Sequence, residues 1–364
     1  TYSRAIRAPN IGELFAPDTI ATIGVDDDPC DNGNINNGTA NRRDNCLQFV
    51  AAGFDSSQFL TAFSTGITGG NPNLMEETSD SFTLGAVFEP KGILGGALDN
   101  FVAIVDYYDI EIKNAVGFLD GEEIAEACVD LPSIDNQFCD QITRDPNRGG
   151  AIVGFVSRNI NQDVLRARGI DFETRYRFDV PFGNGDLGAV TLRAAGTRFL
   201  ERATEGDPVI GQIIAAETDP VQKQLLVTDQ AINSDLLGVI GVPKWIVNFN
   251  VDWDIGKLNL GWRTRWEDSS LQVSNSDATD VAIVDGAVVV SPNVGILDAR
   301  QLYTGDSFEH DFSLTYDVTE KVQLFGGVNN VFDREPFLGS LSRAVSPRGR
   351  FFFPGTIRTS NFPE

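Results

Sequence analysis

Long stretches of this chain alternate apolar and polar residues with a period of two. In residues 245–254, WIVNFNVDWD, Val247 and Phe249 fall on one side of an extended chain, and Asn248 and Asn250 fall on the other. Because successive side chains of a β-strand point to opposite faces, this pattern predicts strands with one apolar and one polar face. The same alternation occurs in residues 170–180, 258–267 and 311–318.

Connector length also alternates between these segments. VPFGNGDLG near residue 184, DIGK near 255 and VTEK near 319 are short, whereas the intervening connectors are long. Short turns at one end, long loops at the other and charged polar faces are typical of an outer-membrane barrel rather than a soluble antiparallel sheet. We therefore predict an all-β, antiparallel transmembrane β-barrel fold. Its ten strands are expected at 1–8, 79–90, 100–114, 156–180, 187–204, 243–255, 257–273, 307–319, 321–334 and 348–362.

Two of the predicted strands are irregular. In the third, Asp106 and Asp109 fall on opposite faces, so one charge points to the apolar side or a bulge intervenes. The tenth contains Pro354, which cannot donate to a strand ladder and belongs at an edge or a bulge.

The negative net charge of the chain argues against nucleic acid as a partner. The 364 residues include 28 Lys and Arg against 52 Asp and Glu, a formal net charge of -24. Nucleic acid is therefore not expected as a partner, because phosphate binding needs a basic surface. The sequence also contains no apolar stretch of about 20 residues, so no transmembrane helix is expected.

The four cysteines fall into two local pairs within polar, loop-like segments. Cys30 and Cys46 are sixteen residues apart, and Cys128 and Cys139 are eleven apart. These spacings do not match a zinc pattern of two close doublets. Two small-loop disulfides between nearest neighbours, formed in an oxidising compartment, are preferred over four free thiols.

Several segments, in chain order, resemble the barrel motifs of TonB-dependent outer-membrane receptors. Residues 2–17, YSRAIRAPNIGELFAP, are similar to that family's aromatic and basic start followed by Arg-Ala-Pro and Glu-Leu-Phe. Residues 70–90, GNPNLMEETSDSFTLGAVFEP, resemble its Gly-Asn-Pro segment. Further similarity lies in VDYYDIEIKNAV, RARGIDFETRYRF, FGGVNNVFDREPF and RGRFFFPGTI.

The resemblance implies that residues 1–364 form the carboxy-terminal part of a larger barrel, of about twenty-two strands in the family, with no plug domain in this sequence. It implies a bacterial outer-membrane location and insertion by the barrel-assembly machinery. It also implies import of a scarce ligand bound in the outer loops, with energy from the TonB complex acting through a plug. The ligand could be a siderophore, vitamin, haem or oligosaccharide. A passive porin-like or adhesin-like barrel is the alternative, and a secreted soluble β-sandwich is a third.

Two sets of side chains are candidates for ligand contact. Aromatic residues near the strand-to-loop junctions could stack on a ligand, although an aromatic girdle at the membrane interface is the alternative. Inward-pointing charges could guide a ligand or hold a plug, although cross-strand ion pairs are the alternative. The aromatic candidates are Trp262, Trp266, Tyr303 and Phe337; the charges predicted to face the lumen are Asp171, Glu173, Arg175, Arg177, Arg193, Arg263 and Arg265.

No catalytic or metal site is expected. The Ser residues have no nearby base, and His310 is the single histidine, so an enzyme, a cofactor or a multi-histidine metal site is disfavoured. The acidic run Asp26, Asp27, Asp28 and Asp31 could bind calcium, but Pro29 interrupts it and a solvated loop is preferred.

Overall fold

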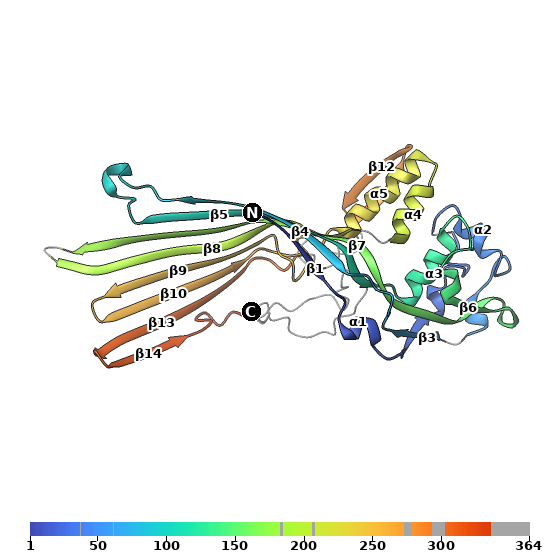
Figure 1. Cartoon of the computed structure of the whole chain (residues 1–364), viewed down its shortest axis with the longest axis horizontal. Coiled ribbons are helices and arrows are strands. Elements are labelled where there is room, and N and C mark those ends of the chain that lie inside the picture. The colour runs from blue at the N-terminus through green and yellow to red at the C-terminus, as the bar shows by residue number, and fades with distance from the viewer. Residues whose placement is uncertain are drawn as a thin grey trace.

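A single antiparallel sheet dominates the computed structural model, which describes residues 1–36, 38–60, 62–182, 185–205, 208–272, 278–292 and 303–335. Nine strands follow one another in the sheet in chain order (Figure 1). All nine match predicted strands, whereas the predicted tenth lies outside the described residues. The strands are β1 (Tyr2–Arg7), β4 (Glu77–Phe88), β5 (Phe101–Phe118), β7 (Ala151–Phe182), β8 (Gly185–Glu205), β9 (Trp245–Ile255), β10 (Leu258–Glu267), β13 (Ser307–Thr319) and β14 (Val322–Val328).

The two ends of the sheet differ in their connections. The hairpin turns after β7, β9 and β13 and the connection from β4 to β5, with its 3-10 turn η3 (Ile93–Gly96), gather at one end. The long connections with the α-helices gather at the other (Figure 1). The predicted alternation of short turns and long loops is therefore confirmed.

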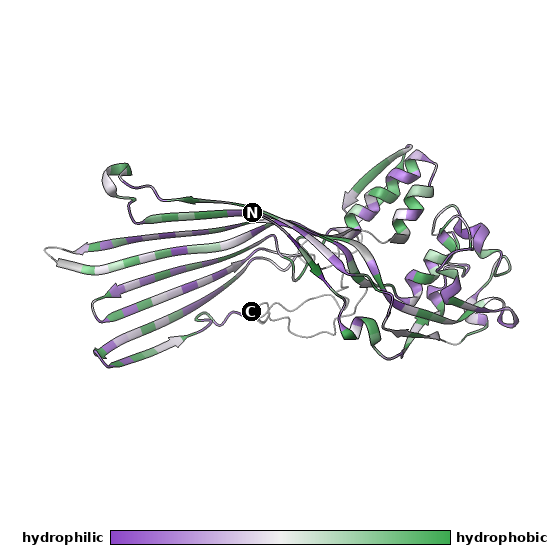
Figure 2. Ribbon diagram, in the orientation of Figure 1, coloured by the Kyte–Doolittle hydropathy of each residue, from purple (hydrophilic) through white to green (hydrophobic). Residues whose placement is uncertain are grey.

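The two faces of the sheet differ as the alternation predicts, and Figure 2 shows hydrophobic and hydrophilic residues alternating along the strands. Strand pairing aligns Val247 with Trp266, and Trp266 with Phe308, on the apolar face. It aligns Asn248 with Arg265 on the polar face.

Two levels of aromatic rings mark the apolar face. The upper level runs across β7, β9, β10 and β13, with centroids 6.3 to 6.5 Å apart. The lower level contains Phe178 and Trp253, which flank Val190 in register. Trp245 and Trp253 lie eight residues apart, roughly 26 Å along the strand, close to the ~25 Å apolar band of a membrane barrel. The upper rings are Phe172, Trp245, Trp266 and Phe308.

Two of the long connections fold together into a compact unit, which we call the cap (residues 18–69 and 119–158). Its core is built around both cysteine pairs and Val129. Strand β3 joins the cap to the sheet by pairing in parallel with the outer end of β7, where Ile67 meets Val156. The cap comprises β2 (Thr19–Gly24), α2 (Arg42–Cys46), β3 (Phe63–Gly69), α3 (Gly121–Asp130), β6 (Ile142–Asp145) and the short 3-10 turns η1 (Val25–Asp27), η2 (Ser56–Gln58), η4 (Cys139–Gln141) and η5 (Pro146–Arg148).

The remaining elements also lie in connections. The connection from β8 to β9 holds two helices, and the one from β10 to β13 holds a hairpin. Among the described residues, none of the helices has the length and apolar character needed to cross a membrane. These elements are α1 (Ile11–Phe15), η3 (Ile93–Gly96), α4 (Pro208–Ala216), α5 (Pro220–Ser234), β11 (Thr279–Val284) and β12 (Ala287–Pro292).

Candidate functional site

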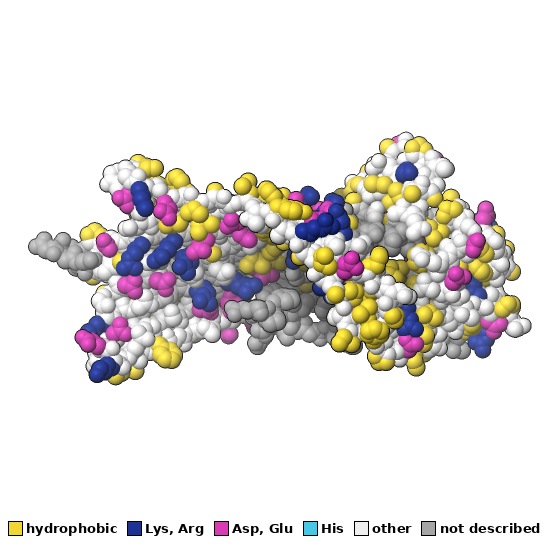
Figure 3. Space-filling view, viewed as in Figure 1, with side chains coloured by type: hydrophobic (Ala, Val, Ile, Leu, Met, Phe, Trp, Pro, Cys, Tyr) yellow, Lys and Arg dark blue, Asp and Glu magenta, His cyan; other side chains and the backbone are white. Residues whose placement is uncertain are grey.

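The charged side chains singled out from the sequence share one face of the sheet. Strand pairing carries this face from β7 through β8, β9 and β10, where Arg193 aligns with Asn250 and Asn250 with Arg263. In Figure 3, charges of both signs gather over this part of the sheet. The structure thus brings together Asp171, Glu173, Arg175, Arg177, Arg193, Arg263 and Arg265.

Like charges stand opposite each other on this polar face. Asp106 is the direct cross-strand neighbour of Asp171, and Arg175 is the direct neighbour of Arg193. Such pairs destabilise a sheet. Part of the charge is balanced, since Glu173 lies 3.4 Å from Arg193. The face therefore carries charges of both signs.

Two hollows lie along this face. The first, of about 610 Å³, is lined by Asp106, Asp171 and Glu173. The second, of about 320 Å³, is lined by two arginines and two aspartates, Arg193, Arg263, Asp252 and Asp311. The polar face therefore offers hydrogen-bonding and charged groups of both signs to whatever occupies the space in front of it.

The aromatic candidates lie elsewhere. Trp262 and Trp266 belong to the apolar face, where the Trp262 ring packs against His310 and Phe332. His310 bonds to the Thr264 hydroxyl at 2.8 Å. This position favours the membrane girdle, and ligand contact by the two tryptophans stays a prediction.

The other two aromatic candidates are less defined. Tyr303 lies half-exposed in the connection after β12, bridged to Leu271. Phe337 lies outside the described residues. Ligand contact by either residue stays a prediction.

Asp109, the charge that breaks the alternation of β5, sits beyond the upper aromatic level. The pairing of β5 is continuous through it, and the next pairing, of β7 with β8, shifts register between Arg168 and Gly169. Asp109 lies 3.0 Å from Arg168, which also bonds to Glu201 at 2.9 Å. The outer face is therefore charged where the strands extend past the apolar band.

Buried ion pairs tie the two connections of the cap together. Arg42 lies 2.5 Å from Asp130, and their side chains are 5% and 9% exposed. Arg144 lies 2.8 Å from Asp28, and these side chains are 7% and 4% exposed. Each pair joins residues far apart in sequence, so the cap folds as one body.

Both cysteine pairs form disulfides inside the cap, as predicted. Cys30 bonds to Cys46, and Cys128 bonds to Cys139. Each bond closes a loop within one of the two connections.

Two residues of the acidic run, Asp28 and Asp31, have structural roles, whereas Asp26 is exposed to solvent as expected of a loop. Asp28 is buried against Arg144, and Asp31 accepts bonds from the backbone N–H and hydroxyl of Ser56. Within the described part of the chain, no three His, Cys, Asp or Glu residues are grouped to hold a metal.

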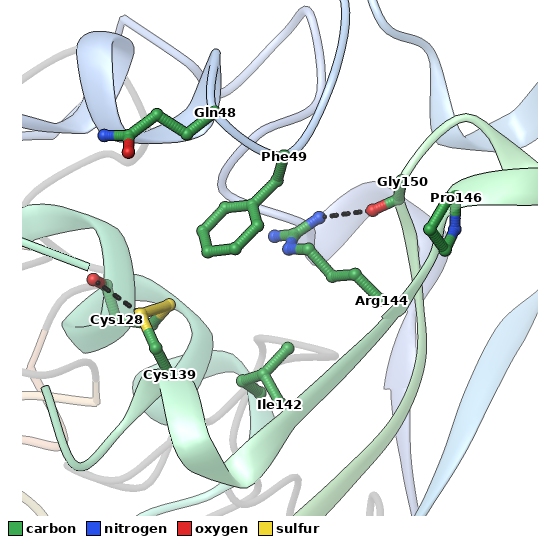
Figure 4. Close-up of a pocket in the computed structure, with 8 residues that line it drawn as sticks. All are labelled: Gln48, Phe49, Cys128, Cys139, Ile142, Arg144, Pro146 and Gly150. Carbon is green, nitrogen blue, oxygen red and sulfur yellow. Dashed lines mark hydrogen bonds between the residues drawn. A yellow bond between two sulfur atoms is a disulfide. The ribbon is translucent and has the colours of Figure 1, made fainter. Parts of the chain in front are cut away.

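A pocket of about 270 Å³ opens into the cap (Figure 4). The Phe49 ring, the Cys128–Cys139 disulfide and Ile142 form its apolar walls. Arg144 stands on the facing wall, donates to the Gly150 carbonyl oxygen at 2.9 Å and stacks over Phe49. The sequence carried no signal for this pocket, because its walls come from separate connections.

One acidic group of the cap has a strongly shifted pKa. Partial burial, with the negative charges of Asp27 and Glu126 nearby, raises the pKa of Glu122 to about 7. This carboxyl therefore changes its charge near neutral pH.

Comparison with known families identifies the family to which this sheet belongs. A family model described as "TonB dependent receptor-like, beta-barrel" matches residues 1–331. The chain belongs to the TonB-dependent receptor β-barrel family. This family consists of receptors and transporters of the outer membrane of Gram-negative bacteria, so the resemblance inferred from the motifs is confirmed.

Solved structures similar to this receptor barrel are also outer-membrane receptors. A mutant ferric enterobactin receptor, PfeA, from Pseudomonas aeruginosa in complex with enterobactin is 14% identical, with a TM-score of 0.48, over 93% of this chain and 33% of that one. The siderophore receptor PirA from Acinetobacter baumannii is 13% identical, with a TM-score of 0.45, over 97% of this chain and 36% of that one. The receptor barrel thus spans about a third of the length of these proteins. A search of curated proteins found no match.

Proposed function

We propose that the receptor containing this chain binds a scarce ligand at its outer loops and imports it with energy supplied through TonB. The main support for this proposal is the family match over residues 1–331. The sheet agrees with it, since its long connections all lie at one end. In this account the polar face lines the aqueous interior of the barrel, and the cap stands on the outer side.

The polar face is suited to passage of a polar ligand. Its charges of both signs, among them Asp171 and Arg193, can exchange hydrogen bonds and ion pairs with a solute at several points along the face. The ligand classes considered are ferric siderophores, vitamins, haem and oligosaccharides, and the face contains donors and acceptors for each.

Uptake measurements test this function. Cells with and without the gene would receive radiolabelled ferric chelates, cobalamin, haem or oligosaccharides, each in the presence and absence of functional TonB. We expect saturable uptake of one class that requires both the gene and TonB. Gene-dependent flux that is linear in concentration and indifferent to TonB would instead indicate a passive porin.

A further inference from the structure

The two disulfides of the cap differ in their access to solvent. Cys30 and Cys46 are both 0% exposed, and Cys128 is 1% exposed. Cys139 is partly exposed, and its bond to Cys128 forms part of the pocket wall (Figure 4). A small molecule that enters the pocket therefore meets one disulfide and not the other.

We propose that this pocket is a thiol-exchange site, at which small thiols react with Cys139 while Cys30–Cys46 stays protected. Exchange requires a thiolate to reach a sulfur atom, so access decides which bond reacts. The pocket of about 270 Å³ is slightly below the ~300 Å³ at which pockets for drug-sized ligands begin. It is therefore large enough to admit a small thiol such as 2-mercaptoethanol.

The facing wall of the pocket is formed by an arginine that is paired with a carboxylate. The Arg144 guanidinium is 7% exposed and held by Asp28. Its Nε makes no hydrogen bond within the part of the chain that the structure describes. The group opposite the Cys128–Cys139 disulfide is therefore a guanidinium paired with Asp28, whose Nη2 also donates to Cys30 Sγ at 3.4 Å.

The reaction balances in two steps. The thiolate sulfur bonds to Cys139 Sγ as the Cys139–Cys128 bond breaks, and Cys128 leaves as a thiolate that takes a proton from water. A second thiol then attacks the mixed disulfide, which frees Cys139 and releases the oxidised thiol. Two external thiols supply the two electrons.

The rest of the cap holds its shape during this exchange. The Cys30–Cys46 bond and the Arg42–Asp130 ion pair do not involve the reacting residues. The Asn136 side chain also donates to the Cys128 carbonyl oxygen at 2.9 Å and accepts from the Cys139 backbone N–H at 3.0 Å. The two sulfurs therefore stay close enough to reform their bond, which makes the exchange reversible.

The test is timed reduction of the receptor in outer membranes with 2-mercaptoethanol, followed by alkylation and mass spectrometry of the four cysteines. We expect Cys128 and Cys139 to be alkylated at least tenfold faster than Cys30 and Cys46. Gln48, exposed at the pocket rim, supplies a matched pair of variants. Gln48→Trp should slow the reaction of Cys128–Cys139 several-fold by obstructing the entrance, whereas Gln48→Ala should leave it unchanged.

Equal rates for the two disulfides, or faster reduction of Cys30–Cys46, would overturn the proposal. So would an unchanged rate in Gln48→Trp, since the thiol would then reach Cys139 by another route.

Discussion

Arg7, the last residue of β1, donates two parallel hydrogen bonds to Glu77, the first residue of β4. Arg7 Nε lies 2.5 Å from Glu77 Oε2, and Nη2 lies 2.7 Å from Oε1. Arg7 also donates to Glu13 of α1 at 3.1 Å, and Glu77 accepts from the Val116 backbone N–H at 2.7 Å. The cluster therefore fixes the point at which the chain leaves the sheet for the cap and returns.

Arg7→Ala should lower the free energy of unfolding by about 1 kcal/mol, because a two-bond ion pair with well-formed geometry exceeds an ordinary surface pair. Urea titration of the membrane-inserted receptor measures this. The control is Arg4→Ala on the same strand, since Arg4 lies 3.9 Å from Asp80 and is 65% exposed. An equal effect of both variants would show that the Arg7 cluster adds nothing specific.

Adjacent alanines on β8 test which face meets lipid. Ala194 pairs with Phe249 on the apolar face, midway between the two aromatic levels, and Ala195 pairs with Glu173 on the polar face. Ala194→Arg should destabilise the receptor by about 2–4 kcal/mol, the cost of Arg at the bilayer midplane. Ala195→Arg should cost much less, because the new charge faces Glu173. Denaturant titrations in which the order is reversed would refute the assignment of faces.

The buried pair in the cap offers a third test. Arg42→Met leaves Asp130 buried without its cation, which should cost about 3–5 kcal/mol. The cap should then become sensitive to protease added to whole cells, while the sheet stays intact. Arg43→Met is the matched control, because Arg43 is exposed and bonds only to Asn36 among the contacts described. Full protease resistance of Arg42→Met would mean that the pair does not hold the cap.

The stability of the cap should depend on pH through Glu122. Its pKa of about 7 in the fold lies above its ordinary value, so the folded cap binds this proton more tightly than the unfolded chain. The resulting stabilisation is full below about pH 4.5 and is lost as pH rises through 7. Protease resistance should decline over this window, and Glu122→Gln should reduce the decline. Identical pH profiles for the two proteins would exclude Glu122 as the cause.

The strands and their faces were predictable because each rests on a local pattern. The alternation around Phe249 and Asn248 needs only neighbouring residues, and the short turns follow directly from it. Strand pairing places the predicted inward charges on one face, with no register shift between Asp171 and Arg177, and that this face lines the lumen stays a prediction. Asp109, the charge that breaks the alternation of β5, lies where the strands extend past the apolar band.

The cap was not predictable, since its contacts are not local. Arg42 and Asp130 are 88 residues apart, and neither lies in a segment with a repeating pattern. From the sequence we expected the long connectors to be loops, although they contain the α-helices and most of the buried core. The tryptophan candidates differ from the cap, because a local pattern already shows which face they occupy. Their period-two position already placed Trp262 and Trp266 on the face opposite Arg263 and Arg265. This pattern favours the membrane girdle more strongly than closeness to a loop favours ligand contact.

The central claim is that this sheet spans a bilayer, with water on its polar face and lipid on its apolar face. The most direct measurement is spin labelling at each position of β9, Trp245–Ile255, in the membrane-inserted receptor, with collision rates for oxygen and for a water-soluble nickel chelate. We predict that the odd-numbered positions collide with oxygen and the even-numbered ones with the chelate, with oxygen access greatest near Phe249. Chelate access at every position, without a period of two, would contradict the account.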